Sequence, residues 1–470
     1  METLTLHRRQ QLIEMITAAL QAVDPAEAIR RHMRRQGDLL QVGDARYNLR
    51  RFRRVIVVGG GKAGAPMAAA VTEILGDRIA GGTVVVKYGH TAPSGAWQVR
   101  FGHSDGSPAP LPPVSLGPIE LVEAGHPIPD MAGLTGTRRI LDWLRDLSPE
   151  DLVICLISGG GSALLPAPAE GIRLEDKQAL TELLLRAGAT IHEINAVRKH
   201  CSTLKGGQLA RRAAPATLLT LVLSDVVGSP LDVIASGPTV PDRSTFADAY
   251  AVLERYGLLE QAPASIVTWI RQGMTGKLAE TPKPGDPCFE RTQTLVIGDN
   301  RIAAQAAAAC ARRLGFSTQI LTTFVEGEAR EVARVCAALL KEEVRANGPL
   351  PRPACLILGG ETTVTVRGQG KGGRNQELAL AAALALDGWT DVALAALGTD
   401  GTDGPTDAAG AVATGWSVRA GEAMGLNAAA MLSNNDAYHF FSALGDLIIT
   451  GPTGTNVNDL ILALAWPNER

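Results

Sequence analysis

An apolar strand that runs directly into a triple-glycine turn constrains the fold of this chain more than any other segment. Residues 55–58 form a β-like apolar run, three glycines follow at 59–61, and a helix-compatible segment begins at Ala63. Glycines allow a sharp turn and a close approach to the backbone, and the free amides at a helix start attract anions. With Lys62 at its tip, the turn predicts an anion-binding loop.

The rest of the chain alternates apolar β-like runs with helical stretches rich in alanine and leucine. This order is typical of a parallel sheet wrapped by crossover helices, so the predicted fold class is α/β. The predicted strands cover residues 55–58, 83–86, 120–123, 152–157, 218–223, 294–297, 318–322, 355–358, 392–397 and 446–449. Most of them end in Gly, Ser or Asp, and ligands bind at the carboxyl ends of the strands in such sheets.

The length of 470 residues exceeds what one compact core usually holds, so two or three domains are expected. Prolines cluster near residue 241, where the first series of strands and helices ends. We therefore predict domains over residues 1–240 and 241–470, although the helical segment at 243–271 fits either half.

The composition argues for small-molecule partners. The 45 basic and 48 acidic residues leave a formal net charge of -3, and aromatic residues make up only 4% of the chain. Nucleic acid and anionic membranes are therefore not expected partners, while self-association is left open. No apolar stretch is long enough to span a bilayer. The six cysteines form no CxxC pair, which indicates buried thiols in a reducing compartment and hence a cytoplasmic protein.

The glycine spacing of the first turn also satisfies the dinucleotide fingerprint, which makes a nicotinamide-dependent enzyme the alternative. Such a site requires an acidic residue at the end of the next strand to bind the ribose hydroxyls. The next strand ends in Lys87, which cannot accept a hydrogen bond from a ribose diol. Lys62 is followed by Ala63 rather than Ser or Thr, so the Walker pattern fails as well. A phosphate-binding turn of neither standard class remains.

A second turn of the same design follows the strand at 152–157, with glycines at 159–161 between Ser158 and Ser162. Its amides and hydroxyls can hold phosphate oxygens, or Ser162 can cap the next helix. The strand at 218–223 leads to Asp225. A carboxylate there can hold magnesium, accept a proton from an attacking hydroxyl, or shape a turn.

Between these strands, a segment with helical periodicity places Asn195, Arg198 and Lys205 on one face. A cationic stripe of this kind suits a carboxylate or phosphate ligand, and a solvated basic face is the alternative. His200, in the same segment, is expected to be structural.

In the second half, a glycine loop opens a helix whose first turn bears Arg374 and Asn375. The planar guanidinium grips phosphoryl oxygens at two points, so Arg374 is a candidate for stabilising charge during phosphoryl transfer. A later loop carries three carboxylates, Asp400, Asp403 and Asp407. Their composition suits a cation or a nucleotide, but their spacing does not match an EF-hand.

Seven of these motifs occur in order along the chain, at residues 57–64, 158–164, 195–202, 224–226, 235–239, 370–377 and 398–406. Together they closely resemble the ATP-dependent glycerate 2-kinases of the MOFRL type, and the resemblance covers nearly the whole chain. It implies two α/β domains with the active site in the cleft between them. The first would hold a Rossmann-like α/β/α parallel sheet, and the second a mixed sheet with the MOFRL segment at about 354–465.

The resemblance implies phosphorylation of D-glycerate at its 2-hydroxyl by ATP with Mg²⁺ or another divalent cation. Some members of the family are labelled hydroxypyruvate reductases, so an NAD(P)H-dependent reductase is the alternative. One departure from the family is visible, because an acidic residue usually stands where this chain has Ser229 and Pro230, although Asp232 lies close by.

The resemblance also implies roles for individual residues. Lys62 and Arg374 would neutralise the transferring phosphoryl group, and Asp225 would be the base or a metal ligand. The substrate would be held by Arg198, Lys205 and Asn195. The residues expected to hold ATP are Gly59, Gly60, Gly61, Ser158, Gly159, Gly160, Gly161, Ser162, Glu361, Asn375 and Asp400.

Overall fold

The structure, a computed structural model, describes residues 4–93, 95, 97–103, 114, 116–346 and 348–467. These residues form two compact units. One contains the described residues of 25–93 and 111–297, and we call it the six-stranded unit. The other contains the described residues of 1–24, 94–110 and 298–470, and we call it the seven-stranded unit.

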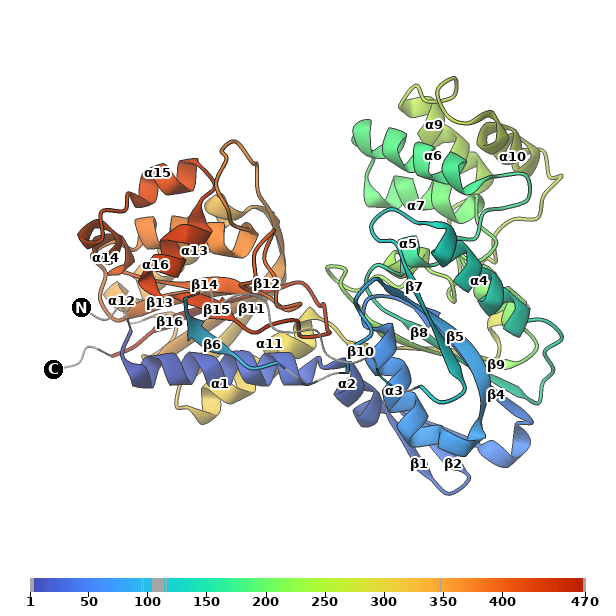
Figure 1. Cartoon of the computed structure of the whole chain (residues 1–470), viewed down its shortest axis with the longest axis horizontal. Helices are drawn as coiled ribbons and strands as arrows, with labels where there is room; N and C mark the ends of the chain where they lie inside the picture. The colour runs from blue at the N-terminus through green and yellow to red at the C-terminus, as the bar shows by residue number, and fades with distance from the viewer. Residues whose placement is uncertain are drawn as a thin grey trace. The chain divides into compact units, whose positions relative to one another are not determined.

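The six-stranded unit is built on a sheet with the strand order β10-β9-β8-β4-β5-β7 (Figure 1). These strands are β4 (Arg54–Gly60), β5 (Ile79–Lys87), β7 (Ile119–Ala124), β8 (Asp151–Ile157), β9 (Thr217–Leu223) and β10 (Thr292–Gly298). From β9 to β7 every neighbouring pair is parallel. All seven residues of β8 and of β9 are buried, as expected for apolar runs covered on both faces.

Helices cover this sheet and also form a second core of their own. They are α2 (Pro25–His32), α3 (Gly64–Leu75), α4 (Met131–Trp143), α5 (Gly161–Leu164), α6 (Leu174–Arg186), α7 (Ile191–His200), α8 (Gln208–Ala213), α9 (Phe246–Arg255) and α10 (Ala264–Met274). Apolar residues of α4 and α8 pack with those of the sheet. The apolar residues of α6, α7, α9 and α10 form a separate hydrophobic cluster. These helices are drawn above the sheet of the same unit in Figure 1. A small antiparallel sheet of β1 (Met33–Gln36), β2 (Leu39–Val42) and β3 (Ala45–Asn48) completes the unit.

The seven-stranded unit contains a mixed sheet with the order β11-β12-β16-β13-β14-β15-β6. Its strands are β6 (Arg100–Gly102), β11 (Ser317–Glu328), β12 (Ala354–Thr363), β13 (Val392–Gly398), β14 (Gly410–Thr414), β15 (Leu447–Ile449) and β16 (Asp459–Ala465). Strands β11 and β12 pair in parallel, and the other described pairs of this sheet are antiparallel. The predicted fold class, a Rossmann-like parallel sheet followed by a mixed α/β sheet, is confirmed.

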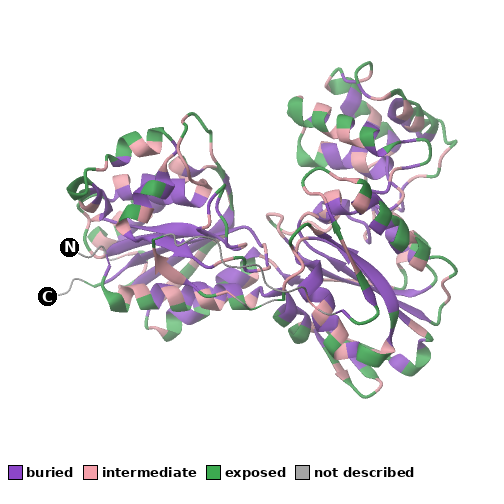
Figure 2. Cartoon of the chain, viewed as in Figure 1, coloured by how far each residue is buried: buried purple, intermediate pink, exposed green. Residues whose placement is uncertain are grey.

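Helices lie on both faces of this mixed sheet. They are α1 (Leu6–Ala22), α11 (Asn300–Arg313), α12 (Ala329–Ala346), α13 (Arg374–Ala385), α14 (Ser417–Ala423), α15 (Ala428–Ser433) and α16 (Ala437–Leu444). Helices α13 to α16 cover one face, while α1 and α11 pack together on the other (Figure 1). Figure 2 shows the buried strands of both sheets between helices whose outer faces are exposed. Of the helices in the described part of the chain, none is long and apolar enough to cross a membrane.

The division into units differs from the predicted boundary at 240/241. Helices α9 and α10 bury Phe246 and Ile270 in one cluster with Leu180 of α6, and β10 then joins the sheet beside β9. The chain therefore leaves the six-stranded unit only after residue 297. The N-terminal segment belongs to the other unit, since Gln11 accepts a hydrogen bond of 2.9 Å from the Trp466 indole.

Candidate active site

The carboxyl edge of the parallel sheet gathers most of the predicted site residues. Five adjacent strands end there, and the chain order reverses between β4 and β8, where ligands bind in open α/β sheets. The residues delivered by β9, β8, β4, β5 and β7 are, in that order, Asp225, Ser158 with its glycines, the first glycine turn with Lys62, Lys87 and His126.

The two glycine turns are joined by hydrogen bonds. The amide of Lys62 donates to the carbonyl of Gly159 at 2.8 Å, and the amide of Ala63 donates to Ser158 Oγ at 3.0 Å. A side chain at Gly61 would collide with Ser158, and Gly61 also has a φ of 149° that favours glycine. The Ser158 hydroxyl therefore connects the turns and satisfies an amide at the start of α3.

Asp225 and Lys62 both lie against the second turn. A Cβ at Gly159 would collide with the carboxylate of Asp225, and a Cβ at Gly160 would stand 3.5 Å from Lys62 Cγ. Glycine at these two positions thus leaves room for a carboxylate and an ammonium side chain at the same turn. This arrangement can bind a phosphate oxygen through Lys62 and present an oxygen ligand or base at Asp225.

His126 belongs to this group, although the sequence interpretation missed it. A Cβ added at Gly160 would also come within 2.9 Å of His126 Cδ2. Burial, followed by the charges of Lys62, Lys87 and His90, lowers the pKa of His126 to about 4. The imidazole is therefore neutral near pH 7. Its place directly after the predicted strand at 120–123 was the signal that could have identified it.

Ser162 links two parts of a hydrogen-bond chain that runs from Lys205 to Asn195 and is partly buried. Lys205 Nζ donates to Ser162 O at 2.7 Å and to Ser162 Oγ at 3.1 Å. Ser162 Oγ lies 3.0 Å from Ser236 Oγ, and Ser236 donates to Asn195 Oδ1 at 2.9 Å. The structure does not place Asn195 and Lys205 on one helical face as predicted, because α7 ends at His200 and Lys205 follows it; this network joins the two residues instead. Ser162 does not cap α5, because the N-cap residue is Gly160.

Ser236 is a second residue that the site prediction did not include. Ala235, Ser236 and Gly237 have φ angles of 50°, 61° and 59°, so three consecutive residues are left-handed. Non-glycine residues in this region carry strain that persists where the surroundings hold them in place. Ser236 is fully buried, and its hydroxyl is held between Ser162 and Asn195. The motif at 235–239 was the available sequence signal.

Two further basic residues of α7, His200 and Arg198, have different environments. His200 is buried, with Nδ1 2.8 Å from Ala196 O and Nε2 3.0 Å from Glu280 Oε2, as expected of a structural histidine. Arg198 is half-buried on α7, and burial lowers the pKa of its guanidinium. The solvated basic face, which was the alternative for this segment, is therefore wrong for Lys205, which is buried, whereas Arg198 stays partly exposed.

In the seven-stranded unit, Arg374 begins α13 and holds two carboxylates. Its Nε and Nη2 donate to Asp459 at 2.6 and 3.0 Å, and its Nη1 donates to Glu361 at 2.7 Å. Although burial opposes the charge, the hydrogen bond to Asp459 holds the pKa of Arg374 above its ordinary value. Burial raises the pKa of Asp459 to about 6. Asp459 was not predicted, because it opens a strand, β16, that the sequence interpretation missed.

The carboxylates of the acidic loop that follows β13 accept hydrogen bonds from protein donors. Asp403 accepts hydrogen bonds from the amides of Asn375 and Gln376 at 3.1 and 2.8 Å, so it caps α13. Asp407 accepts from the Tyr438 hydroxyl at 2.7 Å, and Asp400 accepts from the amide of Thr402 at 3.1 Å. Within the described ranges, no group of three His, Cys, Asp or Glu residues could hold a metal ion.

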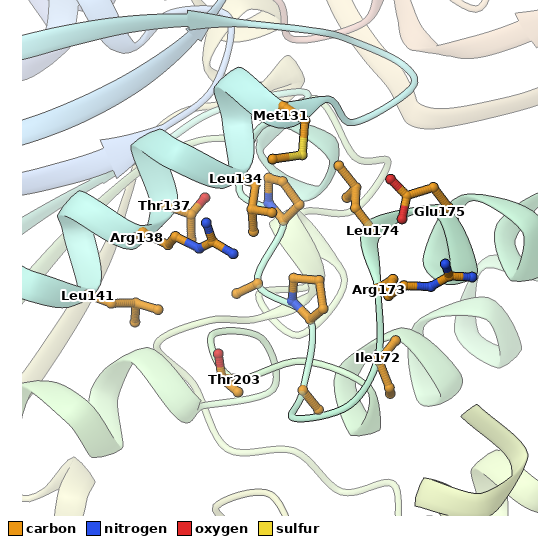
Figure 3. A pocket seen from close by; sticks show the side chains of 14 residues that line it. Met131, Leu134, Thr137, Arg138, Leu141, Ile172, Arg173, Leu174, Glu175 and Thr203 are labelled. Atoms are coloured by element: carbon orange, nitrogen blue, oxygen red, sulfur yellow. The ribbon is translucent and has the colours of Figure 1, made fainter. Parts of the chain in front are cut away.

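A cavity of about 440 Å³ lies elsewhere in the six-stranded unit, between α4 and the segment at 166–175. Its walls combine apolar side chains with polar and charged ones, and Figure 3 shows Met131 and Leu134 on one side and Ile172 and Leu174 on another. The predicted site residues do not line it. The candidate active site is therefore the carboxyl edge of the sheet and not this cavity.

The fold and the strand ends define a two-unit α/β protein with paired glycine turns in one unit and an arginine–carboxylate cluster in the other. Residues 354–459 match the model described as the MOFRL family, and the chain belongs to the family whose model, described as a domain of unknown function (DUF4147), matches residues 11–271. The predicted MOFRL segment at about 354–465 agrees with the first match.

Relatives of the chain carry two kinds of name. A D-glycerate 2-kinase of Thermotoga maritima is 44% identical over 96% of this chain and 97% of its own. A putative hydroxypyruvate reductase of Agrobacterium vitis is 43% identical over 87% of this chain and 86% of its own. The crystal structure of a glycerate kinase from Thermotoga maritima aligns with a TM-score of 0.82 at 43% identity, covering 97% of this chain and 99% of that one.

Proposed function

We propose that this protein is a glycerate 2-kinase, which transfers the γ-phosphoryl group of ATP to the 2-hydroxyl of D-glycerate and releases 2-phosphoglycerate and ADP. The observation that carries the proposal is the hydrogen bond between the Lys62 amide and Gly159, which brings a lysine and two glycine turns to one point of the sheet edge. The near full-length similarity to a named D-glycerate 2-kinase supports the same reaction.

The residues of the sheet edge suit phosphoryl transfer, which depends mainly on positioning and charge. Lys62 would neutralise the transferring group, and the amides of the two turns would bind phosphate oxygens. Asp225 would accept the proton of the 2-hydroxyl or bind a divalent cation. Arg198, Lys205 and Asn195 would hold the carboxylate end of glycerate.

The candidate site fits a magnesium ion, because such an ion needs few ligands from the protein. Mg²⁺ in nucleotide enzymes usually takes one or two carboxylates and completes its shell with phosphate oxygens and water. Asp225, against Gly159, is the carboxylate that would serve. The bound ion would neutralise part of the negative charge of the phosphate groups.

The proposal assigns Arg374 to the same reaction. The two carboxylates take up three of the five guanidinium N–H groups, so a phosphoryl oxygen would bind the remaining N–H groups or replace one carboxylate. Glu361 is the carboxylate that a phosphoryl oxygen would replace, because its side chain is 46% exposed whereas that of Asp459 is 5% exposed. Glu361, Asn375 and Asp400 remain proposed nucleotide contacts.

The second candidate function is a nicotinamide-dependent hydroxypyruvate reductase, since one relative carries that name. The position that should hold the ribose hydroxyls is occupied by Lys87 at the end of β5, beside β4. This observation favours the kinase. A cytoplasmic location and the absence of nucleic-acid or membrane partners belong to the same proposal.

One pair of assays tests the proposal. Purified protein is given D-glycerate, ATP and Mg²⁺, and the phosphorylated carbon is identified by NMR. In parallel, oxidation of NADH and NADPH is followed with hydroxypyruvate. Phosphorylation at C2 is the expected result. Cofactor oxidation without phosphorylation would favour the reductase, and glycerate binding with neither reaction would indicate a non-catalytic binding protein.

A further inference from the structure

Three cationic side chains have no counter-ion in the described part of the chain: the predicted substrate residues Arg198 and Lys205, and Lys177. Lys177, on α6, has its Nζ buried without a hydrogen-bond partner among the residues that the structure describes. Arg198, on α7, makes no ion pair with any described carboxylate. Lys205 donates to Ser162, which is neutral.

This lack of pairing is unusual for the region, and a neighbouring lysine shows the contrast. Lys199 is buried on the same helix as Arg198, and its Nζ lies 3.1 Å from Asp242 and 3.7 Å from Asp232. Buried charges in proteins are normally compensated in this way, because desolvation of an isolated charge is costly. Lys177, Arg198 and Lys205 lack such compensation among the described residues.

The three side chains also repel one another. Burial and, to a smaller extent, the charge of Arg198 lower the pKa of Lys177 to about 8. Burial and the charges of Lys177 and Arg198 lower the pKa of Lys205 as well. The other titratable group facing Lys177 is Cys201, whose pKa is raised to about 12 by burial, so its thiol is neutral and supplies no negative charge.

We infer that Lys177, Arg198 and Lys205 share one anionic ligand, and that this ligand is the carboxylate of the hydroxy-acid substrate. The inference rests on the proposed kinase function and adds Lys177 to its substrate site. A second observation supports a ligand here. Asn195 is 3% exposed and its Nδ2 has no partner in the described part of the chain, although its Oδ1 is joined to Lys205 through Ser236 and Ser162.

The substitution Lys177→Met distinguishes between a ligand-binding role and a structural role for this lysine. A structural lysine would leave the protein less stable when removed. An uncompensated buried cation should instead leave the free protein more stable, because the desolvated charge and its repulsion with Arg198 are gone. The same change should weaken the binding of D-glycerate and leave that of ATP unaltered.

The experiment compares the wild type with Lys177→Met, Lys177→Arg and a control, Lys277→Met, in which an exposed lysine of the same unit is changed. For Lys177→Met we expect a higher thermal midpoint without ligand, a KM for D-glycerate raised at least tenfold, and a KM for ATP within twofold of wild type. Lys177→Arg should restore most of the affinity, and the control should behave as wild type. An unchanged KM for D-glycerate, or a lowered midpoint, would overturn the inference.

Calorimetry on the wild type provides a test that does not depend on a variant. A bound carboxylate should raise the pKa of Lys177 towards its ordinary value, so D-glycerate binding at pH 8 should take up protons. Titrations in buffers of different ionisation enthalpy measure this uptake, and its absence would reject the site. Proton uptake without phosphorylation would reject the kinase but keep the anion site, whereas normal kinase activity without uptake would reject only the site.

Discussion

The amide of Lys62 donates a 2.8 Å hydrogen bond to the carbonyl of Gly159, although almost a hundred residues separate the two glycine turns in the chain. The bond joins the ends of the adjacent strands β4 and β8. The position of Lys62 therefore depends on the geometry of the second turn, and changes in either turn should affect the same reaction.

Gly159→Ala should impair catalysis without unfolding the protein. The added Cβ would collide with Asp225 Oδ2 and lie 2.6 Å from its Cγ, so either the carboxylate or the turn must move. We expect kcat to fall at least tenfold, since displacement of a catalytic group by about 1 Å costs about 100-fold. Steady-state kinetics measures the loss. Gly102→Ala, where the nearest described neighbour of an added Cβ is 3.7 Å away, is the control and should keep wild-type activity.

Lys62→Ala should strongly reduce phosphoryl transfer and leave the fold intact. The side chain is only partly buried, and it lies in the turn between β4 and α3 rather than in the core of either element. Removing a charge that stabilises the transferring group costs on the order of 100- to 1,000-fold in kcat. Circular dichroism and a thermal melt check the fold beside the kinetic assay. Turnover close to that of the wild type would show that Lys62 is not the phosphoryl-binding cation.

Arg374→Lys should lower both kcat and stability. Lysine keeps the charge, but it cannot reproduce the two-point hydrogen bonding to Asp459. Asp459 is buried, so losing part of its pairing should lower the thermal midpoint, and we expect kcat to fall about 100-fold. Arg419→Lys provides a control, because Arg419 is exposed and lies 3.6 Å from the exposed Asp387. Equal kinetics for the two variants would exclude a catalytic role for Arg374.

Asp403 should make the stability of the protein depend on pH. Burial raises its pKa from 3.8 to about 7, so between these values the folded protein keeps a proton that the unfolded chain has released. The contribution of Asp403 to the free energy of unfolding therefore falls as the pH rises from about 4 to 7, and it is constant above that. Thermal melts from pH 5 to 8 should show a smaller decline for Asp403→Asn than for the wild type. Parallel curves for the two proteins would contradict the raised pKa.

His126 should make the stability of the protein depend on pH in the direction opposite to that of Asp403. Its pKa is lowered from 6.5 to about 4, so between these values the unfolded chain binds a proton that the folded protein does not. Stability should therefore fall as the pH drops from about 6.5 to 4. We expect His126→Gln to reduce this loss, as measured by chemical unfolding at pH 4.5 and 7. A change in stability between these two pH values that matches the wild type would show that His126 is not held neutral.

Local patterns in the chain predicted much of this protein correctly. All ten predicted strands are present; they correspond to β4, β5, β7 to β13 and β15. They were predictable because a continuous apolar run bounded by turn residues indicates a buried strand. The two glycine turns and the helix at Arg374 also follow from residues adjacent in sequence. For these elements, conformational preference and hydrophobicity within a short window are sufficient.

Tertiary structure decided which of these segments meet. Strand β16 inserts between β12 and β13, and this placement alone brings Asp459 to Arg374. The packing of α9 and α10 on α6 and α7 keeps residues 241–297 in the six-stranded unit. The roles of His126 and Lys177 depend on desolvation and on charges contributed by distant segments, which are absent from a local window. The sequence alone thus determined the elements and the chemistry they carry, whereas the pairing and burial of charged groups arose only when remote parts of the chain packed together.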